Sequence, residues 1–419
     1  MEIIYERVAG IDVGKKEIAV TVRVPGDGPG AARVEVTRKF KTFYPVLQVM
    51  VAWLVESRVT HVTMESTGVY WRPVFHALCE ADRLFEILLV NAAHVKNVPG
   101  RKTDVKDSQW LAQLLEVGLL RGSFIPPADI TAIRDVTRYR KKVIRSRTSE
   151  LQRLGKVCED AGIKIDSVAS SLTTKSARAM LEALIAGERD PRILADLARG
   201  VMRKKIPDLS MALAGRFGPH HAVLARTHLD QLDHLDAMIA RLDAQIEGMV
   251  TPFSAQIAAL CTIPGIGERT AQVVISEIGV DMSRFPTADH LASWAGLCPG
   301  NNESAGKHGN TRTRKGNQEV RTALVEAAWA TARTSTYLGA RFRRLHRRFG
   351  KKNGGKAAIA IAHNLLIIIW HVLGDGVEFA DLGVDYFHRP DTPAARHRKD
   401  QLVRELQALG YTVEITAAA

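Results

Sequence analysis

Four acidic residues have the types and the spacing of a metal site that acts on phosphate esters. Asp12 and Glu65 each follow a short apolar run that reads as a strand. Asp104 and Asp107 are three residues apart at the start of a predicted helix, so both lie on one helix face. Converging carboxylates repel one another unless cations lie between them. Mg²⁺ or Mn²⁺, which are hard ions with oxygen ligands, fit such a site.

Two such ions, roughly 3.5–4 Å apart, would contact the attacking and the leaving oxygens of a phosphodiester. The alternative is that these are unrelated surface acids, since single acids often cap helices, and Asp104 could be such a cap. Asp12 is harder to explain in that way, because it follows an apolar run within the motif G-I-D-V-G. We therefore expect a metal site formed by the four acids.

The elements that must position these acids lie in residues 1–125, which read as an α/β domain. Three strands are followed by alternating helices and strands, the order typical of a ribonuclease H-like domain. In that fold the first and fourth strands are neighbours, so Asp12 and Glu65 are predicted to lie side by side. The predicted strands are 8–12, 18–24, 33–40, 61–65 and 85–90, and the predicted helices are 44–57, 73–81 and 104–117.

The remainder of the chain is predicted to be mostly α-helical, in two units. Residues 126–250, after a Pro-Pro junction, include apolar residues between 232 and 249 that repeat at 3-4-3-4-3 spacing, a coiled-coil pattern. This pattern fits the arms of a helical hairpin, pairing between subunits, or a plain helical bundle. Residues 251–419 form the third unit, with a basic stretch, a long apolar helix and a tail with a helix and a strand at 401–415.

The charge of the chain indicates a polyanionic partner. Its 58 Lys and Arg against 45 Asp and Glu give a formal net charge of +13 in 419 residues. Between residues 301 and 360 there are 14 Lys and Arg and three acids, a balance of +11. Nucleic acid is the simplest partner for such an excess. A generally basic protein without that partner is the alternative.

A glycine-rich turn in the third unit has the pattern of a helix-hairpin-helix. Residues 263–267 read I-P-G-I-G, with Gly265 and Gly267, and a predicted helix follows them. Such a hairpin directs backbone N–H groups towards a phosphate without reading sequence. A simple glycine-rich helix connection is the alternative.

A polar, basic loop at residues 301–317 contains one serine, Ser304. This hydroxyl could attack phosphorus if a metal or a base activated it. Taken alone, a serine in such a loop is more often a solvated turn residue. Four cations of this loop, and six of the dense basic stretch 341–356, are predicted to bind phosphates. They are Lys307, Arg312, Arg314, Lys315, Arg343, Arg344, Arg347, Arg348, Lys351 and Lys352.

Other features favour a protein of a reducing cytoplasm that does not enter a membrane. The four cysteines are scattered and form no C-x-x-C pair, which fits a reducing compartment. The first residues lack the pattern of a signal peptide. The most apolar run, 357–373, is interrupted by His363 and Asn364 and is predicted to be a buried helix.

These residues together resemble a known family over essentially the whole chain. The chain is similar to insertion-sequence transposases of the IS one-ten family, the DEDD recombinases described as bridge-RNA-guided. The motifs that carry the resemblance are G-I-D-V-G-K-K (10–16), M-E-S-T-G-V-Y-W (64–71), G-R-K-T-D-V-K-D-S-Q-W-L (100–111), S-F-I-P-P (123–127), R-D-V-T-R-Y-R (134–140), I-P-G-I-G (263–267), W-A-G-L-C-P-G-N-N-E-S-A-G-K (294–307) and V-E-F-A-D-L-G-V-D-Y-F (377–387).

The resemblance implies a fold and a mechanism. The four acids match the family's Mg²⁺-binding tetrad in a Holliday-junction-resolvase-like domain. Ser304 matches the nucleophile proposed for a covalent 5′-phosphoserine link to DNA. Many members carry two serines there, whereas this chain has Glu303 at the first position. The helical middle matches a coiled-coil module that forms a dimer or tetramer, and the partners are donor DNA, target DNA and a non-coding bridge RNA.

Two other functions remain open from the residues themselves. A metal-dependent, junction-resolving or structure-specific nuclease would use water as the nucleophile and need no serine. A non-catalytic nucleic-acid-binding protein would use the acids only structurally. Metal-dependent cleavage would exclude the non-catalytic binding protein. A covalent protein–DNA adduct would distinguish the transposase from the nuclease. Because the serine and the acids lie in different predicted domains, the active site could also be assembled between subunits.

Overall fold

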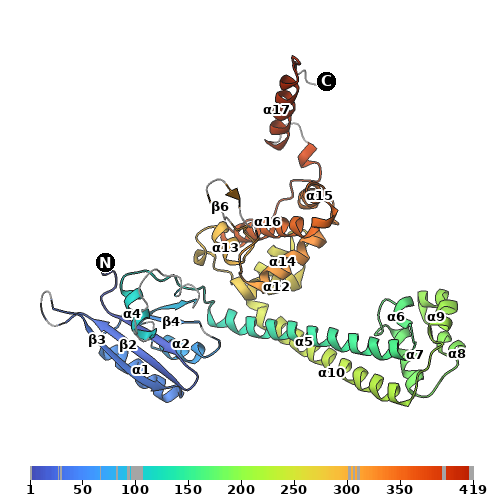
Figure 1. Cartoon of the computed structure of the whole chain (residues 1–419), viewed down its shortest axis with the longest axis horizontal. Helices are drawn as coiled ribbons and strands as arrows, with labels where there is room; N and C mark the ends of the chain where they lie inside the picture. The colour runs from blue at the N-terminus through green and yellow to red at the C-terminus, as the bar shows by residue number, and fades with distance from the viewer. Residues whose placement is uncertain are drawn as a thin grey trace. The chain divides into compact units, whose positions relative to one another are not determined.

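The computed structural model describes residues 2–26, 28, 31–66, 68–81, 84–91, 95, 107–300, 303–304, 307–308, 312–388 and 393–414. The chain forms two compact units, Met1–Ile125 and Pro126–Ala419 (Figure 1). Asp104 lies outside the described residues, as do seven of the seventeen positions of the loop 301–317 that contains Ser304.

The first unit is built on a five-stranded sheet with the order β3-β2-β1-β4-β5. The prediction that the first and fourth strands are neighbours is confirmed: β1 pairs with β4 in parallel and with β2 in antiparallel direction. β4 in turn pairs in parallel with β5. The strands are β1 (Val8–Val13), β2 (Glu17–Val24), β3 (Val34–Lys41), β4 (His61–Glu65) and β5 (Glu86–Val90).

Helices cover both faces of this sheet. On one face, α1 (Tyr44–Glu56) and α2 (Trp71–Cys79) enclose a core that includes Ile11 and Met64. On the other face, α4 (Asp107–Glu116) packs its Leu111 and Leu115 against Val8 and Val90. Since side chains alternate along a strand, residues 8, 10 and 12 of β1 face α4.

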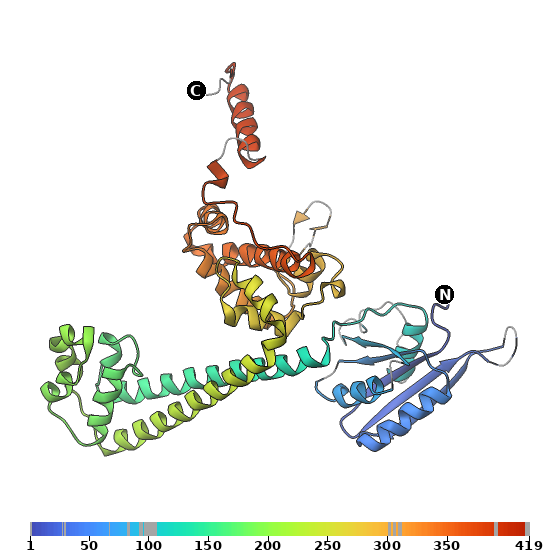
Figure 2. The same ribbon diagram turned by 180° about the vertical axis from the view of Figure 1, so that it is seen from behind.

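The second unit contains a long helical hairpin, α5 (Ala128–Asp160) and α10 (Pro219–Val250), which lie side by side in both views (Figures 1 and 2). Of the alternatives for the apolar repeat at 232–249, this packing corresponds to the arms of a helical hairpin within one chain. Four short helices enclose an apolar core at the far end of the hairpin. They are α6 (Ile165–Val168), α7 (Lys175–Ile185), α8 (Pro191–Asp196) and α9 (Ile206–Ala212).

Four further helices of this unit pack around α16 (Gly354–Gly374). By length and composition, α16 is the one helix of the described part of the chain that could cross a membrane. Its Ile361, Leu365 and Ile369 are fully buried, so it is the predicted core helix. The helices that contact α16 are α11 (Ser254–Cys261), α13 (Ala288–Trp294), α14 (Gln318–Thr331) and α15 (Tyr337–Phe349), whereas α12 (Glu268–Ile278) packs against α5 and α14.

The tail differs in part from its prediction. A helix is present, α17 (Pro393–Ala408), and it begins earlier than expected. The strand predicted after it is wrong over residues 411–414, the part that the structure describes, which has no regular structure. An alternating pattern alone does not make a strand, because the backbone groups of a strand need a partner strand.

Candidate active site

The carboxyl ends of β1 and β4 bring two of the predicted acids together. In the parallel pairing of these strands, Ile11 is the partner of Met64. The next step of the same register places Asp12 opposite Glu65, at one edge of the sheet. Both residues are on the face that α4 covers, because each is one position away from a residue that packs on the opposite face.

A close contact between α4 and β1 brings a third acid to the same place. A Cβ atom on Gly10 would lie 2.3 Å from the carbonyl oxygen of Ser108 and 2.4 Å from the amide nitrogen of Ala112. Only glycine therefore lets α4 approach β1 this closely. Asp107 is the first residue of α4, so it lies near Asp12, the second-last residue of β1.

A buried hydrogen bond fixes the first turn of α4 on the sheet. The Ser108 hydroxyl lies 2.9 Å from the Thr21 hydroxyl of β2, and both residues are fully buried. The Thr21 hydroxyl also lies 2.8 Å from the Thr37 hydroxyl, so each of these three hydroxyls has a hydrogen-bond partner. The position of Asp107 is thus determined by the neighbouring serine.

The electrostatics of this edge support a cation-binding role. Partial burial raises the pKa of the Asp12 carboxyl above its ordinary value, and the negative charge of Asp107 raises it further. Proximity of like charges has this effect because it disfavours ionisation. Oxygen donors in mutual repulsion are the ligand set that a hard divalent ion satisfies. Asp12, Glu65 and Asp107 could therefore hold such an ion, and Asp104 lies outside the described residues.

The predicted nucleophile lies in the second unit, in a small hairpin. β6 (Glu303–Ser304) pairs in antiparallel direction with β7 (Lys307–His308), and Lys307 is the register partner of Ser304. The chain enters and leaves this loop through a narrow stem. Gly300 donates a backbone hydrogen bond to Arg312 at 3.0 Å, and Pro299 forms an isolated bridge with Thr313.

The base of the stem requires two glycines. A Cβ atom on Gly316 would lie 2.2 Å from the amide nitrogen of Gly296, which has a φ of +70°. Directly after this contact, the backbone N–H of Asn317 donates to the carbonyl of Trp294 at 3.3 Å. We call residues 301–317 the serine loop. Its end is tied to the helical core at Asn317.

The I-P-G-I-G segment does connect two helices, α11 and α12, but its glycines have different surroundings. Gly265 has a φ of +87°, and a Cβ atom there would lie 2.1 Å from the Thr331 hydroxyl oxygen of α14. That glycine is thus required for internal packing. Gly267 is the residue before α12, and a Cβ atom there would meet nothing within 4 Å. Of the two glycines predicted to contact a phosphate, Gly267 is therefore the one with open space beside it.

The basic stretch predicted to bind phosphates forms α15 and the turn after it. Arg343 donates to the carbonyls of Ala332 and Thr334, at 3.1 and 3.0 Å, so it partly serves the fold. The Arg344 guanidinium lies 5.0 Å from the centroid of the Phe387 ring. The remaining predicted residues with described side chains, Arg314, Lys315, Arg347, Arg348 and Lys352, are exposed, as is Arg312. The side chains of Lys307 and Lys351 lie outside the description.

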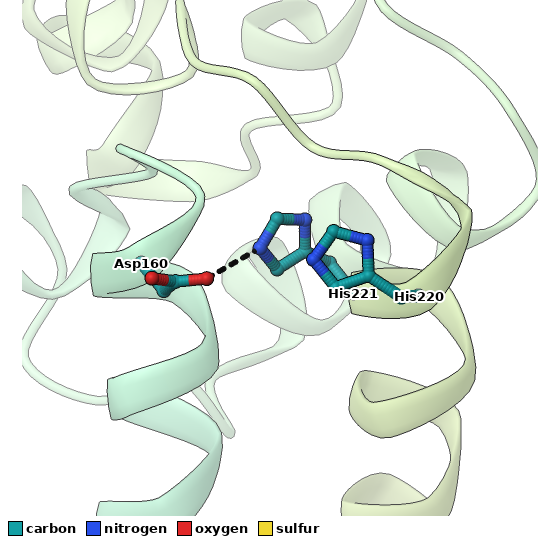
Figure 3. Close-up of side chains that lie close together, drawn as sticks. All are labelled: Asp160, His220 and His221. Carbon is teal, nitrogen blue, oxygen red and sulfur yellow. Dashed lines mark hydrogen bonds and ion pairs between the residues drawn. The ribbon is translucent and has the colours of Figure 1, made fainter.

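A different group of possible metal ligands lies in the second unit. Asp160, His220 and His221 place one ligand atom each within 4.8 Å of one another (Figure 3). The bonds of His221 argue for another role. Its Nδ1 accepts from the backbone N–H of Gly218 at 3.0 Å, so its Nε2 carries the proton that it donates to Asp160 at 2.9 Å. The group thus joins the end of α5 to the start of α10.

Sequence reasoning missed residues that position the site without carrying its chemistry. Gly10 was visible in G-I-D-V-G, but its contact with α4 needs the fold. Thr21 and Ser108 could have been found as polar residues on the inward sides of a strand and a helix. Glu277 of α12, which is buried beside the end of the serine loop, could not be told from an exposed helix acid in the sequence.

Two family models match separate parts of the chain. The model of a transposase family named DEDD transposase IS110 matches residues 9–161, which include three described acids and Asp104. The model of the transposase IS116/IS110/IS902 family matches residues 257–343, which include Gly265, Gly267 and Ser304. Together they span more than half of the chain.

Curated proteins give the same result. The chain is 26% identical to a "Probable family 20 transposase" of Pseudomonas aeruginosa over 317 residues, 74% of this chain and 83% of that protein. It is 33% identical to an IS110 insertion-element protein of Streptomyces coelicolor over 32% of this chain and 33% of that protein. A pilin gene-inverting protein of Moraxella bovis is 41% identical over 18% of this chain and 24% of its own length. The chain belongs to the IS110 family of transposases, enzymes that act on DNA by cleavage and strand transfer.

Proposed function

We propose that this transposase excises and inserts an insertion sequence through a covalent phosphoserine intermediate, with a carboxylate site that binds two Mg²⁺ ions. The observation that carries the proposal is the convergence of Asp12, Glu65 and Asp107 at one edge of the sheet. Asp104 completes the set in this proposal. Mn²⁺ substitutes for Mg²⁺, because both are hard ions that bind carboxylates.

When bound, the ions supply positive charge at the scissile phosphate. The residues of the chain then have distinct tasks. Asp12 and Glu65 fix the site on the rigid sheet, and Asp107 closes it from α4. The hydrogen bond between Ser108 and Thr21 keeps Asp107 in place. Such fixed positions matter because misplacement of a reacting group by about 1 Å can reduce a rate by about a hundredfold.

In the proposed chemistry, the Ser304 hydroxyl oxygen attacks the phosphorus of the scissile phosphodiester. A bond forms between this oxygen and phosphorus, and the bond from phosphorus to the 3′ oxygen of the cut strand breaks. The serine gives up its proton, and the 3′ oxygen gains one and leaves as a hydroxyl. The 3′ hydroxyl of the partner strand then reverses the step and releases the serine. Phosphodiester energy is conserved throughout.

The proposed partners are donor DNA, target DNA and a non-coding bridge RNA in the prokaryotic cytosol. The exposed cations of α15 and of the serine loop support them, since phosphates bind such residues without sequence preference. Lys307 and the residues around it then bind the phosphates closest to the reaction. Base pairing with the RNA supplies the target sequence, and the α5–α10 hairpin contributes to a dimer or tetramer.

The test is a search for a covalent protein–DNA adduct on denaturing gels. The protein is expressed beside its flanking non-coding DNA, with donor and target plasmids and Mg²⁺. We expect an adduct with the wild type and none with Ser304→Ala, Asp12→Asn or Asp107→Asn. The controls are Ser293→Ala and Glu56→Gln, which change exposed residues of α13 and α1 and should leave the adduct intact.

The outcomes separate the alternatives. Cleavage that needs Asp12 but survives Ser304→Ala without an adduct would mean water attack by a nuclease. Nucleic-acid binding without cleavage by any variant, in the presence of Mg²⁺ and RNA, would contradict the proposal entirely. Removal of the non-coding region should abolish the adduct if RNA guides the reaction.

A mixing experiment tests whether one site is shared between subunits. Asp104→Ala protein and Ser304→Ala protein, each inactive alone, are combined and assayed for the adduct. Recovery in the mixture is expected if the serine of one subunit acts with the acids of another. No recovery at any mixing ratio would place all five residues in one subunit.

A further inference from the structure

A buried carboxylate lies where the hairpin, α12 and the end of the serine loop meet. Glu277 of α12 is 1% exposed. Burying a charge in this way costs free energy unless ion pairs and hydrogen bonds compensate it. The partners of Glu277 therefore decide what this residue does.

Two of those partners come from the base of α5. Arg138 donates from Nε to Oε1 at 2.7 Å and from a terminal nitrogen to Oε2 at 2.8 Å. This two-pronged geometry is the strongest form of an arginine–carboxylate pair. Arg134 lies 3.4 Å from Oε2, and it also donates to the backbone carbonyl of Ser276 at 3.1 Å. The end of α12 is thus fixed to α5.

The third partner is the last residue of the serine loop. The Asn317 side-chain nitrogen donates to Oε2 of Glu277 at 2.7 Å. The other end of the same amide accepts the backbone N–H groups of Glu319 and Val320, each at 3.0 Å, and so caps α14. Every polar group of this side chain has a set partner, so its orientation follows the position of the carboxylate.

We propose that Glu277 is a positioning residue for strand cleavage, which sets the end of the serine loop by linking Asn317 to Arg134 and Arg138 of α5. The inference deepens the proposed function, because it assumes that the serine loop carries the nucleophile. Two arginines of α5 contact the Glu277 carboxylate, and the same carboxylate contacts Asn317, which is thirteen positions after Ser304. A shift of α5 at this point moves the end of the loop.

The test exchanges the two functional groups. Asn317→Asp alone places two carboxylates at the distance of a hydrogen bond, so they repel. Glu277→Gln combined with Asn317→Asp restores one amide and one carboxylate, with the hydrogen bond reversed and the charge unchanged. The matched control is Gln318→Glu, the same amide-to-carboxylate change one residue away, where the exposed side chain donates a hydrogen bond to Thr322 of its own helix.

Two readouts are needed. The first is the rate of adduct formation with saturating DNA, together with the DNA concentration that gives half of that rate. Asn317→Asp should lower the rate by about tenfold to a hundredfold with unchanged half-saturation, and the double variant should recover most of it. The second is cleavage by trypsin after Lys307, Arg312, Arg314 or Lys315, located by mass spectrometry. Asn317→Asp should speed this cleavage, and the double variant should slow it again.

The second readout keeps this inference separate from the proposed function. If the wild type forms no adduct, the serine mechanism fails, while trypsin still reports the link between Glu277 and the loop. A double variant no better than Asn317→Asp in either readout would overturn the inference. So would an equal loss with Gln318→Glu, since that change does not touch Glu277.

Discussion

Three arginines of α5 and two of α15 have opposite surroundings. On α5, Arg138 pairs with Glu277, Arg140 with Asp243 and Arg147 with Asp236. On α15, Arg347 and Arg348 are exposed, and no carboxylate of the described residues forms an ion pair with either. The difference shows that a basic run indicates a polyanion only where no neighbouring helix supplies acids at facing positions.

The largest expected effect is on stability at the paired side of this comparison. Glu277→Ala should lower the free energy of unfolding of the second unit by about 2–3 kcal/mol, because it removes a buried acceptor and leaves two partly exposed guanidinium groups without their anion. Urea denaturation followed by circular dichroism measures this change. Arg347→Ala, the control on α15, should stay within about 0.5 kcal/mol of the wild type. A loss below about 1 kcal/mol for Glu277→Ala would mean that the pair is not a structural requirement.

The next effect is on nucleic-acid binding at the unpaired side. Arg347→Ala combined with Arg348→Ala should weaken DNA binding and reduce the slope of log affinity against log salt by about two, one phosphate contact for each residue. Filter binding or fluorescence anisotropy at several salt concentrations gives the slope. The matched double variant Arg140→Ala with Arg147→Ala should leave the slope unchanged. Equal slopes in the two double variants would remove the distinction between the helices.

A smaller effect is expected from a single exposed pair of the hairpin. The second guanidinium nitrogen of Arg147 lies 3.0 Å from Asp236. Because both side chains are partly exposed, Arg147→Ala should reduce stability by only about 0.2–1 kcal/mol. The cycle with Asp236→Asn measures the pair itself. Additive effects of the two changes would show that the pair contributes nothing.

The smallest effect is a dependence of hairpin stability on acid. The hydrogen bond from Arg178 holds the pKa of Asp233 below its ordinary value. A lowered pKa in the folded state adds stability above about pH 4, and that stability is lost as the pH falls through the lowered pKa. Asp233→Asn should therefore reduce stability at pH 6 and have little effect at pH 2.5. An equal effect at both values would contradict this assignment, and Arg347→Ala should show no such dependence.

The sequence predicted which acids meet at the sheet edge better than it predicted which basic residues form ion pairs within the fold. Alternation within two short strands and the order of the elements suffice to place Asp12 beside Glu65, because parallel neighbours end at one edge. The pairing of Arg140 with Asp243 could not be read in the same way. It depends on the register of two long helices, and each residue alone resembles those of α15. Glu277 was missed since its three partners come from segments distant in sequence.

The length of α5 has a mechanical consequence. From Arg138 to Asp160, 22 residues of continuous helix span about 33 Å. A tilt of about 5° at the arginine end would therefore displace the opposite end by about 3 Å. The four short helices packed there would move together with it, since they share one apolar core with both arms. A small rotation of α5 near Arg138 thus moves the four short helices by about the length of a hydrogen bond.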